Sequence, residues 1–259
     1  MIIIQPTKTR FVDIHHQDWD LGWSIQFPEA FGSSEAFSMS WMPIAPDWEK
    51  RGDNTWGYSW RTTRDYVQAM KGELVDYTFA VGLALDSEIS TVDNEVRLKL
   101  TISNESSESW PHVRCDGGCF QARSEAFVDG EEVARSHLCV GGEMESMRDH
   151  DRTIPIRAMY RAPTEVPGKE EASSFWGHTD VQPDEPAIIG AVSRDGSKAV
   201  VMGYEHAARA MQNADGHHCL HSCPFFGTLE PGDSVTRHGL ILFGEDIEAL
   251  AAALRGRIG

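Results

Sequence analysis

Apolar and polar residues alternate along the stretch NEVRLKLTISN, residues 94–104. Successive side chains on a β-strand point to opposite faces, so this alternation separates two sets of residues. The apolar set comprises Val96, Leu98, Leu100 and Ile102, and the polar set comprises Arg97, Lys99 and Thr101. One face is therefore expected to lie in a hydrophobic core and the other in water, which is typical of an antiparallel sheet.

Similar short segments recur along the chain and are separated by turn residues. The predicted strands cover residues 10–16, 23–27, 37–42, 76–85, 94–104, 110–115, 120–128, 132–140, 154–162, 188–193, 198–204 and 234–243. Asp195 and Gly196 lie between two of them and are a strong hairpin signal. Roughly a dozen short strands without strand–helix alternation predict an all-β fold, a large antiparallel β-sandwich of supersandwich or jelly-roll type.

Other segments are expected to lack strands. Residues 45–60 are rich in Trp, Asp, Gly and Asn and predict a long loop, and the charged residues 141–153 predict another. A short helix is expected over residues 64–71, and residues 163–172, rich in Pro, Gly and Glu, predict a loop or linker.

One C-terminal helix is predicted over residues 245–254, where an apolar stripe recurs at helical spacing. The stripe consists of Ile247, Leu250, Ala251 and Leu254. Acidic residues begin this segment and arginines follow it, which complements the helix dipole. We expect residues 1–259 to form a single β-sandwich domain that ends in this short helix.

The formal net charge of −17 argues against binding to nucleic acid or to anionic lipid. The apolar residues 1–5 stop at Pro6 and are followed by Lys8 and Arg10, which is the reverse of a secretory signal. No run approaches the roughly 20 apolar residues of a membrane span. The five cysteines are an odd number, which argues against a complete disulfide framework. We therefore expect a cytoplasmic protein with neither a nucleic-acid partner nor a membrane partner.

The stretch NADGHHCLHSCPFFGTLEPG, residues 213–232, packs three histidines and two cysteines into residues 217–223. If this segment is extended, alternation places four of these side chains on one face. They are His217, Cys219, His221 and Cys223, whereas His218, Leu220 and Ser222 point the other way. A row of four side chains that can bind metal or move protons predicts a functional centre.

The row permits two kinds of chemistry. His221 stands beside Pro224, Phe225 and Phe226, which favour partial desolvation and so general acid or base catalysis. Asn213 and Glu205 are near in sequence and are expected to orient His221 or to contact the substrate.

Alternatively, His217, His221 and Cys219 can hold zinc or another divalent metal, since zinc accepts mixed His and Cys ligands. A second group, His112, Cys115 and Cys119, offers a further ligand. The purely structural interpretation is that these cysteines are small buried apolar residues and the histidines form core hydrogen bonds.

Aromatic and basic residues suggest how a ligand would bind. Flat aromatic faces stack on sugar rings while polar neighbours bind the hydroxyl groups. The expected substrate-binding residues are Trp176, His178, Trp56, Arg61 and Arg123. Arg64 and Arg114 are further candidates for a local positive pocket that would hold a carboxylate or an oxyanion.

The stretch NEVRLKLTISNESSESWPHVRC resembles a strand–turn–strand unit of galactose-mutarotase-like supersandwiches. The stretches GAVSRDGSKAVVMGYEHAARAMQN and CLHSCPFFGTLEPGDSVTRHGLILF resemble uncharacterised bacterial β-sandwich proteins associated with carbohydrate use. The sharpest elements of the resemblance are Asn213, Cys219-Leu220-His221, Pro224, Gly227 and Pro231-Gly232. The resemblance implies a role related to sugars and no defined mechanism.

We expect a carbohydrate-active enzyme, a lyase, hydrolase or epimerase, that acts on a sugar or an oligosaccharide with His221 as acid or base. The alternatives are a non-catalytic carbohydrate-binding protein, a metal-dependent enzyme of cupin-like layout, and a structural or oligomer-forming sandwich. The sequence contains no nucleophile elbow, Walker loop or dinucleotide fingerprint. The first reading requires no cofactor, and the cupin-like reading requires zinc or another divalent ion.

Overall fold

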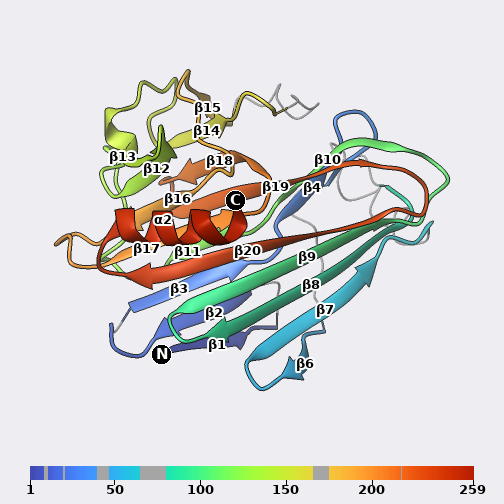
Figure 1. Cartoon of the computed structure of the whole chain (residues 1–259), viewed down its shortest axis with the longest axis horizontal. Helices are drawn as coiled ribbons and strands as arrows, with labels where there is room; N and C mark the ends of the chain where they lie inside the picture. Colours follow the sequence, from blue (N-terminus) through green and yellow to red (C-terminus); the bar gives the residue numbers. More distant parts are fainter. Residues whose placement is uncertain (9–10, 20, 40–46, 65–79, 166–174, 217) are drawn as a thin grey trace.

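Strands β8 (Leu83–Val92) and β9 (Glu95–Asn104) alternate between buried and more exposed residues, as the sequence predicts. The computed structural model describes residues 1–8, 11–19, 21–39, 47–64, 80–165, 175–216 and 218–259. The described strands form two large sheets of antiparallel character, and a single α-helix follows them at the C-terminus (Figure 1). The all-β sandwich with a short C-terminal helix is thus confirmed.

The first sheet has eleven described strands, with the path β1-β2-β3-β11-β19-β10-β4-β5. Strand β18 pairs with β19 and with β14, and β15 pairs in parallel with β14. Its members are β1 (Ile2–Pro6), β2 (Phe11–His16), β3 (Leu21–Gln26), β4 (Ala30–Gly32), β5 (Ser38–Met39), β10 (Trp110–Asp116), β11 (Cys119–Ala122), β14 (Arg157–Arg161), β15 (Gly177–His178), β18 (Ala207–Asn213) and β19 (Cys219–Leu229).

The second sheet has nine described strands in the order β13-β12-β16-β17-β20-β9-β8-β7-β6. Besides β8 and β9, its members are β6 (Glu49–Gly52), β7 (Thr55–Arg61), β12 (Ser136–Val140), β13 (Glu143–Ser146), β16 (Ile189–Val192), β17 (Ala199–Tyr204) and β20 (Ser234–Gly244). A short 3₁₀-helix, η1 (Met147–Asp149), follows β13.

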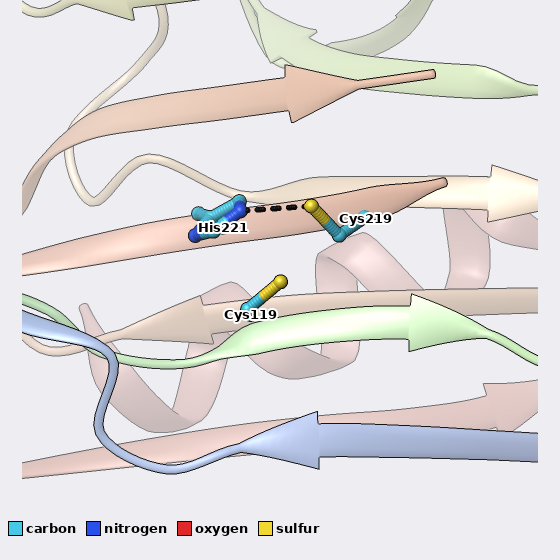
Figure 2. Close-up of side chains that lie close together, drawn as sticks. All are labelled: Cys119, Cys219 and His221. Carbon is cyan, nitrogen blue, oxygen red and sulfur yellow. Dashed lines mark hydrogen bonds between the residues drawn. The ribbon is translucent and has the colours of Figure 1, made fainter. Parts of the chain in front are cut away.

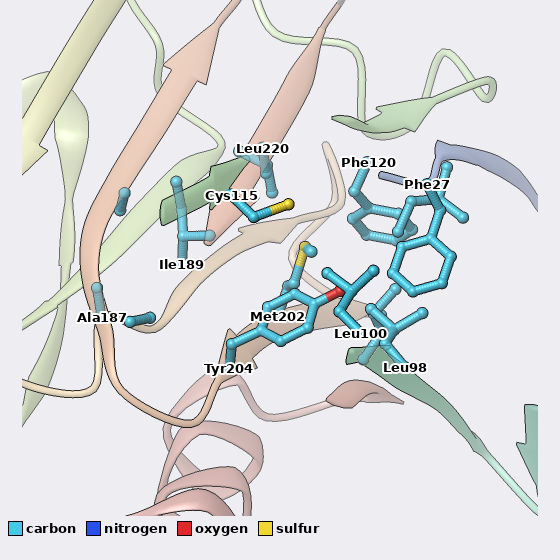
Figure 3. Packing of buried hydrophobic residues seen from close by; sticks show 14 of the residues in the cluster. Phe27, Leu98, Leu100, Cys115, Phe120, Ala187, Ile189, Met202, Tyr204 and Leu220 are labelled. Carbon is cyan, nitrogen blue, oxygen red and sulfur yellow. The ribbon is translucent and has the colours of Figure 1, made fainter. Parts of the chain in front are cut away.

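One hydrophobic cluster draws residues from both sheets. Figure 3 shows part of it, with Phe27 and Phe120 from the first sheet's side facing Leu98 and Leu100 of β9. All four side chains are at most 1% exposed. The apolar half of the alternating pattern in β9 is therefore buried between the sheets, where it excludes water from both.

Helix α2 (Ile247–Ile258) lies across β17 and β20 on the outer side of the second sheet (Figure 1). It begins where Asp246 accepts hydrogen bonds from the backbone N–H groups of Glu248 (2.9 Å) and Ala249 (3.1 Å). Its buried residues Ala251 and Leu254 belong to the predicted stripe. The helix covers this part of the sheet, which explains why every residue of β17 is buried.

Two predicted loops contain strands instead. Residues 45–60 were expected to form a loop, yet β6 and β7 form a hairpin at the sheet edge, with Lys50 opposite Trp56. In the second loop, β13 pairs with β12. Hydrogen bonds to neighbouring strands stabilise both segments although neither alternates in sequence. Residues 65–71 of the expected helix and 76–79 of an expected strand lie outside the described residues, and no described helix is long and apolar enough to cross a membrane.

Tyr204, at the end of β17, joins the two sheets. Its hydroxyl donates a 2.8 Å hydrogen bond to the carbonyl of Gly117, in the connection between β10 and β11. A Cβ atom at Gly117 would lie 2.6 Å from the tyrosine ring, and one at Gly239 would lie 2.5 Å from it. Both positions therefore require glycine, because the ring occupies the space where their side chains would project.

We expect Tyr204→Phe to lower the free energy of unfolding by about 1–3 kcal/mol, because the buried carbonyl of Gly117 loses its partner. The matched control is Tyr160→Phe, since Tyr160 is equally buried and its hydroxyl donates to no acceptor among the described residues. Urea unfolding curves of the two variants measure the difference. Equal losses would contradict the assigned importance of the bond to Gly117.

Candidate functional site

Strand β19 runs through the interior of the first sheet, where β11 and β18 flank it. Leu220 belongs to the core cluster, and the hydroxyl of Ser222 donates to the carbonyl of Ala187 at 2.9 Å. The neighbouring residues Cys219 and His221 therefore project from the opposite side of the strand, as the alternation predicts. Residue 217, the first histidine of the predicted row, lies outside the described residues.

We call the outward-facing side of this part of the sheet the polar face. The strand register assigns to it residues from four adjacent strands. They are Ser24 and Gln26 of β3, Cys119 and Gln121 of β11, Cys219, His221 and Cys223 of β19, and Arg209, Met211 and Asn213 of β18.

His221 lies between a carboxylate and a thiol. Its Nδ1 is 3.1 Å from Oε2 of Glu29, and its Nε2 is 3.1 Å from Sγ of Cys219. His221 is 2% exposed and Glu29 is 5% exposed, so this ion pair is screened little by water. The carboxylate thus faces one ring nitrogen, and the other nitrogen is turned toward sulfur.

The surroundings of His221 determine its charge. Burial by itself lowers the pKa of the imidazole, but the Glu29 carboxylate and the Cys119 thiol outweigh burial and raise the pKa well above its ordinary value. The contact with Cys219, followed by burial, raises the pKa of the Cys119 thiol. The protonated form of the imidazole is therefore favoured, and so is the protonated form of the Cys119 thiol.

Cys119 completes a compact group with Cys219 and His221. The two sulfur atoms and the imidazole nitrogen all lie within 4.8 Å of one another. Figure 2 shows Cys219 and His221 on β19, with the sulfur of Cys119 directed toward them from the neighbouring strand. Gln121 donates a hydrogen bond from its amide Nε2 to the sulfur of Cys119 at 3.1 Å. The set contains the ligand atoms that soft metal ions prefer.

Trp176 packs beside His221. Their ring centroids are 6.2 Å apart and the rings are nearly perpendicular, at 82°. Trp176 is half-buried against Met159, Met211 and Cys223, which together form a small apolar cluster. It is the most exposed member of this cluster. An aromatic ring therefore borders the imidazole.

Arginine side chains gather around one buried carboxylate next to this group. Glu165 is in ion-pair contact with Arg209, which lies opposite Cys223. Arg161 and Arg114 approach the same carboxylate at 3.6 Å and 3.9 Å. The side chain of Glu165 is 3% exposed. Guanidinium groups bind carboxylates and oxyanions, so this cluster places such donors beside the polar face.

Two other predicted residues lie near the group. Asn213 is opposite Cys219, and its side-chain oxygen accepts a 2.8 Å hydrogen bond from the backbone N–H of Asp215. Arg123 directly follows β11 and donates from Nε to the hydroxyl of Ser24 at 2.7 Å. Asn213 therefore stabilises a turn, and Arg123 borders the polar face at β3.

The structure places other predicted residues elsewhere. Glu205 accepts hydrogen bonds from the backbone N–H and Nδ1 of His238, at 3.0 Å and 3.2 Å, beside β20 of the second sheet. Arg61 is exposed and pairs with Glu105 at 2.9 Å. Trp56 packs against the core from β7. These three residues belong to a different region from His221, and no described contact joins any of them to it.

His178 also lies apart from the group. It is exposed at the end of β15 and borders a separate cavity of about 710 Å³ that is lined mainly by acidic and basic residues of 149–152 and 179–181. Trp176, two residues earlier, contacts His221 instead. Trp176 and His178 thus lie in different regions of the molecule, although only one residue separates them in sequence.

Glu29 and Gln121 are the residues in direct contact with the group of Cys119, Cys219 and His221 that sequence reasoning missed. Glu29 is the only charged residue within residues 21–34, LGWSIQFPEAFGSS, and an isolated charge in such a stretch is a usable signal. Gln121 lies two residues after Cys119 and so shares its face of β11. Glu205 is near His221 in sequence, but the carboxylate that meets it comes from Glu29.

No family model matches the chain, and no curated protein matches it. Solved structures do resemble it. An α-mannosidase from Enterococcus faecalis V583 matches with a TM-score of 0.50 and 10% sequence identity. The match covers 97% of this chain and 29% of that enzyme, so it shows a shared fold and nothing about activity.

Two further structures are similar over nearly the full length of both this chain and their own. A galactose mutarotase related enzyme from Lactobacillus acidophilus matches with a TM-score of 0.49 and 8% identity, covering 95% of this chain and 98% of that one. A galactose mutarotase-like protein from Lactobacillus casei matches with a TM-score of 0.48 and 11% identity, covering 94% and 100%. The structural neighbours thus include proteins described as galactose mutarotase-like, which is the family that the sequence resembles.

All five cysteines are buried and none forms a disulfide. Burial raises the pKa of Cys139 to about 11 and raises that of Cys223 well above its usual value. We expect the native protein to react with Ellman's reagent at least about 100-fold more slowly than the unfolded chain, because the thiolate is scarce and inaccessible. Five thiols should react in denaturant. Rapid stoichiometric labelling of the folded protein would contradict this burial.

Proposed function

We propose that the protein is a carbohydrate-active enzyme that binds its sugar over the polar face and uses His221 to transfer a proton. The observation that supports this proposal is the contact between Nδ1 of His221 and the buried carboxylate of Glu29. A histidine that transfers protons is effective when a second group holds its ring in one orientation, and Glu29 is placed to do so.

The orientation of the ring assigns different tasks to its two nitrogens. The carboxylate at Nδ1 favours a proton on that atom, because its negative charge stabilises the protonated ring. The raised pKa keeps a proton on Nε2 as well, so Nε2 is the atom that donates a proton to the sugar and takes one back later in the reaction. Lyase, hydrolase and epimerase reactions all include a proton transfer to or from the sugar, so each is compatible with this group.

Trp176 supplies the surface on which a sugar ring would rest. Its ring borders His221 and is the most exposed part of the apolar cluster around it. Stacking on an aromatic face buries the apolar face of a sugar and leaves the hydroxyl groups free to form hydrogen bonds. The guanidinium groups of the adjacent cluster are donors that suit hydroxyls or a sugar carboxylate.

The first test requires a substrate, which a screen of oligosaccharides and uronates would identify. With that substrate, His221→Gln should lower kcat by about 10²–10⁴-fold, the usual contribution of a positioned proton-transfer group. Glutamine is of similar size, so the fold should persist. Initial-rate kinetics and circular dichroism measure the two effects.

His238→Gln is the control, because His238 is a half-exposed histidine that is paired with Glu205 on the other sheet. It should leave turnover unchanged. Full activity in His221→Gln would refute the catalytic assignment. Specific sugar binding without turnover of any compound in the panel would favour a non-catalytic binding protein instead.

Trp176→Ala should act mainly on binding. Stacking stabilises the bound substrate and the transition state alike, so KM is expected to rise while kcat changes little. Losing about 1 kcal/mol of ring contact corresponds to a roughly fivefold rise in KM. Steady-state kinetics on the same substrate measures both constants. A fall in kcat with an unchanged KM would show that Trp176 positions His221 rather than the sugar.

A further inference from the structure

We propose that Cys119, Cys219 and His221 form a binding site for a soft divalent metal ion, with zinc as the ion that fits best. This inference goes beyond the proposed function and stands on the geometry of the three side chains. Two sulfur atoms and one imidazole nitrogen are a common set of three protein ligands for zinc.

The spacing of the ligand atoms fits one tetrahedral ion. Zinc lies about 2.3 Å from sulfur and about 2.0–2.1 Å from nitrogen, which places neighbouring ligand atoms roughly 3.5–3.8 Å apart. Here Sγ of Cys219 is 3.1 Å from Nε2 of His221, and all three ligand atoms lie within 4.8 Å of one another. These distances bracket the required range, so small side-chain rotations are the adjustment that a zinc ion would require.

The backbone holds the ligands in place before any ion binds. Cys219 and His221 are two residues apart on β19 and so share one face. Cys119 begins the adjacent strand, where Phe120 pairs with Leu220 and Gln121 pairs with Cys219. This register brings Cys119 beside His221, and the bond between Tyr204 and Gly117 fixes the start of β11.

Two residues that would not bind the ion themselves, Glu29 and Gln121, contact two of the ligands and favour metal binding by them. The Glu29 carboxylate faces Nδ1 of His221 and so directs Nε2 toward the sulfurs. Histidines that bind metal commonly have such a carboxylate at the other nitrogen. Gln121 donates an N–H group to the sulfur of Cys119 at 3.1 Å, which stabilises negative charge on that sulfur.

The geometry disfavours a disulfide between Cys119 and Cys219. The register makes Cys119 and Cys219 diagonal neighbours on paired strands, and such pairs have Cα atoms about 7–8 Å apart. Disulfides rarely bridge Cα separations above about 7 Å. Hard ions such as magnesium are also disfavoured, because they prefer oxygen ligands.

Metal at this site would occupy Nε2 of His221, the atom to which the proposed function assigns proton transfer. A nitrogen that coordinates a metal ion cannot accept a proton. Zinc is therefore expected to inhibit turnover, and this one consequence rests on the proposed function. Binding itself does not depend on it.

The first experiment uses the full chain as purified. After treatment with a chelator, it is titrated with Zn²⁺ and its metal content is measured by elemental analysis, and we expect about one bound equivalent. Co²⁺ in place of zinc should give thiolate-to-cobalt charge-transfer absorption and tetrahedral d–d bands, while Mg²⁺ should not compete. Absence of zinc binding, or cobalt spectra without sulfur ligation, would overturn the proposal.

Variants then test which residues bind the ion. Cys119→Ser and Cys219→Ser should each weaken zinc binding strongly, and Gln121→Ala should weaken it by roughly 10–100-fold as an outer partner. Cys223→Ser is the matched control, because Cys223 is an equally buried cysteine on the same face of β19 but lies outside the group. If Cys223→Ser lost zinc as completely as the other two, the assigned ligands would be wrong. If a variant failed to fold, the cobalt spectrum of the unaltered chain would still decide.

Turnover measurements separate the two proposals. Zinc binding with inhibition that a chelator reverses supports both of them. Zinc binding without any effect on turnover supports the metal site and contradicts the role of His221 in proton transfer. Turnover that depends on His221 in a protein that binds no zinc overturns the metal site and leaves the proposed function intact.

Discussion

The hydrogen bond from Tyr204 to the carbonyl of Gly117 crosses from one sheet to the other. It links the end of β17 to the connection that leads into β11, and the ring of Tyr204 occupies the space beside the two glycines 117 and 239. Strand β11 begins two residues later, so this contact anchors the chain just before Cys119, whose position along β19 is set by the pairing of the two strands. The arrangement of side chains on the polar face therefore depends on the packing of Tyr204 in the core, although Tyr204 does not belong to that face.

Burying charged groups on a sheet is costly unless each charge meets a partner. The polar face meets this requirement through specific pairs, with Glu29 facing His221 and Glu165 facing Arg209. Both carboxylates come from segments outside the strands that carry their partners. Such pairs add little net stability compared with apolar contacts of similar volume, whereas removing one partner would leave a buried charge unpaired and destabilise the fold.

The sequence predicted those features that depend on local periodicity. The alternation in β9, the stripe in α2 and the shared face of Cys219 and His221 all follow from the repeat of a strand or a helix. The hairpin of β6 and β7 was missed because its segments lack alternation, and β7 forms through pairing with β8 while β6 pairs with β7. Pairing between distant strands also explains why Glu29, and not Glu205, meets His221. The register that unites residues 29, 119 and 221 is a property of the whole sheet.

Strand β19 carries two sets of residues that are interleaved one by one. Residues such as Leu220 belong to the core, and residues such as His221 belong to the polar face. Inserting or deleting one residue within this strand would exchange the two sets, whereas a change of two residues would keep each set on its own side. In descendants of this chain, length changes in this strand should therefore occur in even steps, or be confined to the loops at its ends.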